Sequence, residues 1–308
     1  TGISAAGTWT ISQSTDAPDG FTSSIKYDCT TANTSLGSTA QLYLVQKIEA
    51  QNLQHLGYGS SAAQDTTFSF YFKTNKTGVY TVELFQADAS RSIGFEMDVS
   101  QTGWQRYQFV IPGDTAGTIN NDNGIGLWCF VWLAAGSSFT SGTFNNGAWD
   151  TGTQANRLSP RNVNFADSTS NELYITGYQF ELGRNATEFE HRSYGEELAL
   201  CQRYYGKIRL SNQEWIYNES NSTWGKWWNG YIPFSMRANP NVDSTDLTGG
   251  VSVSGLSGTV STITPQTPGD TPGRVSMRVT MTVDSGTARA MYHTDGWASD
   301  YLAFDAEL

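Results

Sequence analysis

Apolar and polar positions alternate through much of the first 183 residues. In residues 66–73, Phe68, Phe70 and Phe72 occupy every second position, with Thr, Ser, Tyr and Lys between them. A period of two is typical of an antiparallel strand with one buried face. The turn "NKTG" follows, and residues 79–85 repeat the period. We therefore predict a hairpin whose inward side chains on the return strand are Tyr80, Val82 and Leu84.

Similar segments recur every 10–20 residues, separated by Gly, Asn and Asp turns. Residues 38–50, 106–111 and 172–182 have strand-like patterns, and residues 126–134 are apolar on both faces, as a central strand is. There is no alternation of strands with helices. The pattern predicts an all-β fold: a jelly-roll β-sandwich over residues 1–183.

A short helix is predicted directly after this domain. Residues 184–193 are polar, and apolar residues then recur at intervals of four, three and four. This spacing forms one narrow seam on a helix near 194–205, within a linker covering 184–206. So short a helix is unstable alone in water. We expect the seam either to pack around the threefold axis of a homotrimer or to close one end of its own sandwich. The seam consists of Tyr194, Leu198, Cys201 and Tyr205.

Residues 207–308 return to strand-like patterns and predict a smaller C-terminal β-domain. Residues 274–283, "RVSMRVTMTV", alternate clearly, and "YLAFDAEL" supplies a last strand. Residues 251–265 are rich in Gly and Ser and poor in large apolar side chains. We expect this region to gain stability from surface buried between chains.

The composition narrows the possible partners. Charged residues make up 15% of the chain and aromatic residues 13%, and the net charge is −11, with acidic residues in excess in both halves. Without a basic stripe, nucleic-acid binding is disfavoured. No stretch reaches transmembrane length and no signal peptide is visible, so membrane insertion is not expected. The sequence already has the pattern of a folded domain at Thr1. We therefore expect this chain to be the C-terminal part of a longer polypeptide.

Cysteine and metal signals are weak. The spacing of the three cysteines fits neither a metal site nor a redox motif. The sequence leaves undecided whether Cys29 and Cys129 form a disulfide, and the third cysteine is Cys201. "NDNG" at 121–124 and "DSGT" at 284–287 offer oxygen donors, but such sequences are first of all turns. We predict no cofactor and no defined metal site, with a structural calcium left open.

Few residues suit catalysis. Glycoside hydrolysis needs two carboxylates about 5–10 Å apart, and nothing in the sequence pairs the strand carboxylates Glu83, Glu172 and Glu181. Glu83 is expected on an outward, solvated face. No histidine lies beside a G-x-S-x-G turn, so nucleophilic catalysis is also disfavoured. The three histidines are His55, His191 and His293.

Aromatic residues are the best candidates for binding, because sugar rings stack on Trp and Tyr. A polar segment without strand alternation contains four large rings. We predict that they lie in a loop and contact another subunit, a ligand or other parts of the same chain. Trp149, in "FNNGAWDTG", is a single candidate of the same kind. Trp128, Phe130 and Trp132 share one face of the central strand and are interpreted as core. The four rings are Trp224, Trp227, Trp228 and Tyr231.

Residues 175–205 resemble a joint found in virion proteins of tailed phages, including tail-fibre and head-fibre proteins. There a jelly roll similar to carbohydrate-binding modules ends in Q-[LF]-E-x-G and continues through A-T-x-F-E-x-R-S into E-L-x-x-C-Q-R-Y-Y. "DAPDGF" at 16–21, "IPFSMRANP" at 232–240 and "FDAEL" at 304–308 fit the same family. The insert "STWGKWWN" departs from it. The matching residues are Gln179, Phe180, Glu181, Gly183, Ala186, Thr187, Phe189, Glu190, Arg192, Glu197, Leu198, Cys201, Gln202, Arg203, Tyr204 and Tyr205.

The resemblance implies a structural or adhesive protein of the virion, and it supplies no catalytic residues. Fibres of this kind are commonly trimeric. The expectation is therefore a non-enzymatic, homotrimeric fibre or adhesin module that contacts other virion proteins and host-surface glycan. Two alternatives stay open: a glycan-depolymerising enzyme of a phage fibre, and a monomeric bacterial carbohydrate-binding module.

Overall fold

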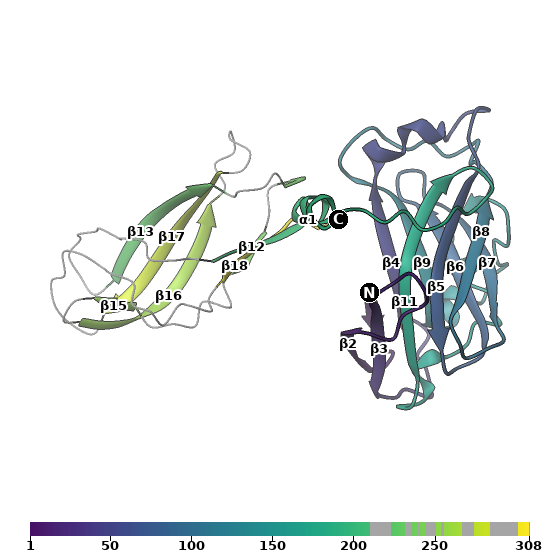
Figure 1. Cartoon of the computed structure of the whole chain (residues 1–308), viewed down its shortest axis with the longest axis horizontal. Coiled ribbons are helices and arrows are strands. Elements are labelled where there is room, and N and C mark those ends of the chain that lie inside the picture. Colours follow the sequence, from purple (N-terminus) through teal and green to yellow (C-terminus); the bar gives the residue numbers. More distant parts are fainter. Residues whose placement is uncertain are drawn as a thin grey trace. The chain divides into compact units, whose positions relative to one another are not determined.

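The computed structural model describes residues 1–209, 223–231, 236–238, 241–243, 251–253, 256–266, 274–283 and 301–307. The chain divides into two compact units, Thr1–Glu190 and His191–Leu308 (Figure 1). Among the described helices, none is long and apolar enough to cross a membrane.

The first unit is a sandwich of two antiparallel sheets, which confirms the predicted all-β class. In spatial order, sheet A consists of β1 (Gly2–Ser4), β4 (Gln41–Glu49), β9 (Ile125–Ala135), β6 (Gly78–Gln86), β7 (Arg91–Val99) and β10 (Asp150–Thr151). In the same order, sheet B consists of β2 (Thr8–Ser14), β3 (Ser24–Thr31), β11 (Glu172–Leu182), β5 (Thr66–Thr74) and β8 (Gln105–Ile111).

Short 3₁₀ helices interrupt the connections between these strands. They are η1 (Ala50–Leu56), η2 (Ser137–Phe139), η3 (Gln154–Asn156) and η4 (Phe165–Asp167). The last three belong to the long connection between β9 and β11. The part of this connection that contains η2 and η3 packs on the outer surface of sheet A, through Phe139 and Leu158.

The main core lies between the two sheets. Phe68, Phe70 and Phe72 on β5 are buried there, and so are the alternate apolar residues of β6. The prediction for this hairpin is confirmed, because its period of two places one face of each strand inward. On β9, Cys129, Val131 and Leu133 face the same core.

The opposite face of β9 is also buried, but in a different core. Phe130 and Trp132 pack with Phe139 and Leu158, which belong to the connection after β9. The interpretation as core is confirmed for Phe130 and Trp132, whereas Trp128, the third ring of that prediction, is only half-buried. They lie outside the space between the sheets, on the outer side of sheet A.

The second unit begins with α1 (Tyr194–Gln202), a helix with a capping box at Ser193 and Glu196. The predicted helix near 194–205 thus ends earlier, and Tyr205 begins strand β12. One small sheet consists of β12 (Tyr205–Arg209), β18 (Tyr301–Asp305) and β14 (Asn241–Asp243). The other consists of β13 (Thr223–Tyr231), β17 (Arg274–Val283), β16 (Leu256–Gln266) and β15 (Val251–Val253).

Candidate functional site

Large side chains from three neighbouring strands pack together on the outer side of sheet A. On β9, Trp128 lies between Lys47 of β4 and Phe85 of β6 in the strand register. Phe130 lies between Val45 and Glu83 in the next row. Directly opposed residues on one face of a sheet contact each other. Three neighbouring strands thus bring these groups together although they are far apart in sequence.

The connection after β9 covers some of these side chains and leaves others partly accessible. Phe139 and Leu158 lie over Phe130 and Trp132, which are fully buried. The half-buried remainder forms a surface that we name the aromatic face. It consists of Tyr43, Val45, Lys47, Phe85 and Trp128.

A buried ion pair lies beside the aromatic face. Glu83 is fully buried and accepts two hydrogen bonds from Arg157, 2.7 Å from Nε to Oε1 and 2.9 Å from Nη2 to Oε2. Trp132 Nε1 donates to Oε2 at 2.7 Å. The expectation of a solvated Glu83 was wrong: its outward face is covered by the connection that carries Arg157. Burial raises the pKa of Glu83, and Arg157 opposes that shift.

Arg157 ties this connection to the rings of sheet A. Its guanidinium carbon lies 4.8 Å from the ring centroid of Phe85, 5.1 Å from that of Phe130 and 5.2 Å from that of Trp132. A planar guanidinium stacks on aromatic faces and also binds a carboxylate with two parallel hydrogen bonds. Arg157 makes both kinds of contact, so it fixes the position of Phe85 next to Trp128.

Trp128 has features that suit a binding residue. Its ring is half-buried, and Lys47 Nζ lies 5.5 Å from the ring centroid. Its Nε1 is enclosed and has no hydrogen-bond partner in the structure. Phe85 contacts the ring edge to face, and the Lys47 ammonium lies over the ring. The apolar surface of an indole is of the kind that stacks on sugar rings.

The outer side of sheet B differs in character. Lys26 lies 2.8 Å from Glu172, and Lys73 lies 2.5 Å from Asp16. Both ammonium groups lie over the ring of Tyr174, at 5.6 and 5.1 Å from its centroid. Charges of both signs are paired here, as on an ordinary solvated sheet face.

The carboxylates considered for catalysis do not form a pair. Glu172 and Glu181 lie nine positions apart on β11, which corresponds to about 30 Å along a strand. Glu181 accepts hydrogen bonds from Thr187, and Glu83 lies in the other sheet with both oxygens bonded. Neither His55 nor His191 is buried, and His293 lies outside the described residues.

The structure places the predicted aromatic cluster on a strand. Trp224, Trp227, Trp228 and Tyr231 all belong to β13, which pairs antiparallel with β17. The expectation of a loop was wrong. The register sets Trp227 beside Arg278 and Trp228 beside Met277. Because neighbouring positions of a strand belong to opposite faces, positions 224 and 228 fall on one face and positions 227 and 231 on the other.

Trp149 is less available than its loop sequence suggested. It is half-buried, its Nε1 donates to the carbonyl of Pro112 at 2.7 Å, and its ring contacts Tyr58 edge to face at 5.9 Å. These contacts give the indole a packing role within the sandwich. We therefore correct the expectation of an exposed ring.

The residues of the predicted seam are exposed in the single chain. Tyr194 is 81% exposed, Leu198 40% and Tyr205 42%, and Cys201 is also exposed. No residue of α1 is buried. Tyr194, Leu198 and Cys201 lie on α1, whereas Tyr205 lies on β12, so the seam does not continue to its last member on one helix.

Thiols and oxygen donors form no evident metal site in the described part of the chain. Cys29 and Cys129 are free and buried, so the disulfide that the sequence left open is not formed. Within the described ranges, no three His, Cys, Asp or Glu residues cluster as metal ligands would. Asp122 of "NDNG" accepts a hydrogen bond from Gly124 N at 2.8 Å, which confirms a turn.

No family model and no curated protein matches the chain. The solved structures that are similar to the chain include a phage tailspike domain and two structures of carbohydrate-binding modules. The enzymatically active domain of tailspike protein 4 from bacteriophage CBA120 is 13% identical, with a TM-score of 0.33 over 59% of this chain and 19% of that domain. A family 16 carbohydrate-binding module is 10% identical, with a TM-score of 0.28 over 56% of this chain and 89% of the module.

The third similar structure is the tandem of family 22 carbohydrate-binding modules from Paenibacillus barcinonensis Xyn10C. It is 9% identical, with a TM-score of 0.29 over 100% of this chain and 94% of the tandem. At these similarities, the β-sandwich assignment rests on the strand order and register of this chain.

Proposed function

We propose that this protein is a non-enzymatic, glycan-binding module of a phage virion fibre, and that the aromatic face of sheet A contacts the glycan. The observation that carries the proposal is the half-buried Trp128, held beside Phe85 on the outer side of a rigid sheet. A planar aromatic platform on a fixed scaffold binds sugar rings with little loss of conformational entropy.

The virion assignment rests on the sequence of the joint at 175–205. Several of its residues bond to one another: Gln179 Nε2 lies 3.1 Å from Thr187 Oγ1, and Gln179 Oε1 accepts from the Glu190 amide at 2.8 Å. These contacts pin the segment after β11 to the sandwich. Because these residues contact one another, the motif corresponds to one local structure and not to unrelated surface positions.

The absence of catalysis is part of the proposal. The three carboxylates named from the sequence are each engaged in other contacts, and none faces another across a cleft of the described structure. The test is incubation of the purified chain with surface polysaccharide of host bacteria. We expect retention of the polysaccharide on the immobilised protein without release of reducing ends. Release of reducing ends at a rate that scales with protein concentration would establish the glycan-depolymerising alternative.

We also propose that the chain assembles as a homotrimer through α1. A helix of nine residues with no buried side chain lacks the packing that stabilises helices in proteins. Tyr194, Leu198 and Cys201 would gain that packing from the same residues of two further chains. The alternative, in which the helix closes one end of its own sandwich, predicts a monomer.

Leu198→Asp tests the trimer. In a trimer it brings three carboxylates together in a buried interface, at a cost of several kcal/mol, so light scattering should change from a trimer to a monomer mass. Leu200→Asp is the matched control, because Leu200 is similarly exposed, at 45%, but lies outside the seam. A wild-type chain that scatters as a monomer at micromolar concentration would refute this part of the proposal.

A further inference from the structure

The aromatic face follows β4 along the outer side of sheet A. Every second residue of this strand from Tyr43 to Lys47 belongs to the face. In the regular register of this segment, Tyr43 lies beside Trp132, and Lys47 lies beside Trp128. Trp132 is covered by the connection after β9, whereas the side chains on β4 are half-buried. The accessible part of the face is therefore a row that begins at Trp128 and ends at Tyr43.

The ring of Tyr43 lies on the backbone of the neighbouring strand. Tyr43 pairs with Gly2 of β1, and a Cβ atom at position 2 would lie 2.1 Å from Tyr43 Cζ, 2.3 Å from Oη and 2.4 Å from Cε2. Because Cζ is the nearest of the three atoms, position 2 lies above the plane of the ring and not beyond its edge. Glycine is the residue that allows so close an approach. One face of the ring thus rests on the sheet.

Neighbouring rings of β9 hold Tyr43 in this position. The ring centroids of Phe130 and Trp132 lie 5.0 and 4.8 Å from that of Tyr43, at interplanar angles of 88° and 61°. Edge-to-face contacts of this kind stabilise aromatic pairs. Tyr43 nevertheless stays half-buried. Since one face rests on Gly2, the accessible part of the ring is a fixed aromatic surface on the outer side of the sheet.

The two accessible rings of the row are separated by more than one sugar. Tyr43 lies four positions from Lys47, the neighbour of Trp128, which corresponds to about 13 Å along a strand. Val45 lies between them and adds apolar surface. A single sugar ring is smaller than this separation, whereas a chain of several linked sugars can reach both. The second contact of such a chain costs little further translational freedom.

We propose that Tyr43 is a second sugar-stacking position of the aromatic face, and that the ligand is a chain of several linked sugars that runs along β4 from Trp128 to Tyr43. This inference rests on the proposed binding of glycan at Trp128 and names the length of glycan that the face recognises. A single terminal sugar contacts only one of the two rings and binds more weakly.

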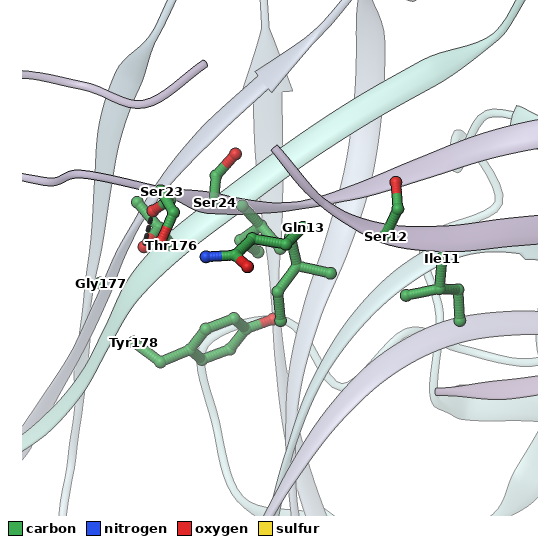
Figure 2. A pocket seen from close by; sticks show the side chains of 10 residues that line it. Ile11, Ser12, Gln13, Ser23, Ser24, Thr176, Gly177 and Tyr178 are labelled. Carbon is green, nitrogen blue, oxygen red and sulfur yellow. Dashed lines mark hydrogen bonds between the residues drawn. The ribbon is translucent and has the colours of Figure 1, made fainter. Parts of the chain in front are cut away.

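The groove on sheet B does not offer a comparable surface. It lies at β2, β3 and β11 and is lined by residues that include Ile11, Gln13 and Tyr178 (Figure 2). Tyr178 is its one aromatic residue, and this ring stacks on the buried Phe70, 5.4 Å away between centroids, with its hydroxyl enclosed. The ring therefore belongs to the core, and the sugar chain is assigned to sheet A.

The probe is a length series of one purified host-surface oligosaccharide, from its single sugar to several linked repeats. We expect the affinity of wild type to rise with length and to level off once the chain reaches both rings. Tyr43→Ala should weaken binding of the longest member by up to about tenfold, the effect of one aromatic stacking contact. It should leave binding of the shortest measurable member unchanged. Tyr43→Phe keeps the ring and should bind like wild type.

Gly2→Ala is an independent variant, because its Cβ displaces the ring of Tyr43 while the phenol stays in the chain. We expect the same loss for the longest member. Tyr71→Ala is the matched control, since Tyr71 is also half-buried but lies on β5 of sheet B. It should bind every member like wild type. Thermal unfolding checks that each variant is folded.

Two outcomes would overturn the inference. One is an affinity of wild type that does not rise with length, and the other is wild-type binding of the longest member by folded Tyr43→Ala and Gly2→Ala chains. Glycan binding at Trp128 survives either outcome if Trp128→Ala weakens binding of the shortest member. A folded Trp128→Ala chain that binds every member like wild type refutes the proposed function, and this inference with it.

Discussion

The two outer faces of the sandwich are built from similar strands but differ in chemistry. On sheet A, the aromatic face is held by a buried ion pair whose carboxylate is inaccessible to water. On sheet B, lysines and carboxylates pair at the surface around Tyr174. A covering connection thus converts one sheet face into a rigid platform. The other face keeps charges that pair at partly exposed positions, where water competes for them.

The largest expected effect is on the ion pair of sheet A. Arg157→Ala leaves Glu83 buried without its partner, which typically costs about 3–5 kcal/mol of unfolding free energy. Lys73→Ala removes a partner from Asp16 on sheet B, where both side chains are partly exposed, at 28% and 39%. That loss should be about 1 kcal/mol or less. Urea denaturation measures both, and equal losses would remove the distinction between the faces.

The pH dependence of stability should also differ in sign. Hydrogen bonds from Lys73 and Trp104 lower the pKa of Asp16 below its ordinary value of 3.8. Its contribution is therefore present above pH 3.8 and is lost as the pH falls through the folded pKa. Asp16→Asn should remove this part of the acid destabilisation.

For Glu83 the sign is reversed, because burial raises its pKa above the ordinary value of 4.5. Its contribution is present below pH 4.5 and is lost as the pH rises through the folded pKa. Thermal unfolding of wild type and of Glu83→Gln across the acidic range measures the difference. An advantage of wild type over Glu83→Gln that grows as the pH rises would contradict this assignment.

Much of the fold could be predicted from alternation alone. Phe68, Phe70 and Phe72 repeat strictly, so the strand and its buried face follow from the period of two. β13 could not be found this way, because "TWGKWWNGY" places large rings at both odd and even positions. The helix end was missed for a related reason: Tyr205 continues the helical spacing, but the backbone has already entered β12.

The candidate site was only partly visible in the sequence. Phe85 is out of phase with the inward series Tyr80, Val82 and Leu84, so the period of two could have placed this ring on the outer face. Arg157 gave no such signal, because its contact with Glu83 depends on how the connection after β9 folds back over sheet A. A buried carboxylate with a remote partner looks the same in sequence as a solvated one.

The prediction with the smallest expected energetic effect is the most direct test of glycan binding by the aromatic face. Trp128→Ala removes the platform on sheet A, and stacking on one aromatic ring contributes about 0.5–1.5 kcal/mol. Trp104→Ala is the matched control, because Trp104 is also half-buried but belongs to the sheet B side, where it donates to Asp16 at 2.9 Å.

The measurement is equilibrium binding of wild type, Trp128→Ala and Trp104→Ala to one purified host-surface oligosaccharide, with thermal unfolding as a check that each variant is folded. We predict that Trp128→Ala weakens binding by up to about tenfold, and that Trp104→Ala binds like wild type. Undiminished binding by a folded Trp128→Ala chain would contradict the assignment of glycan binding to sheet A.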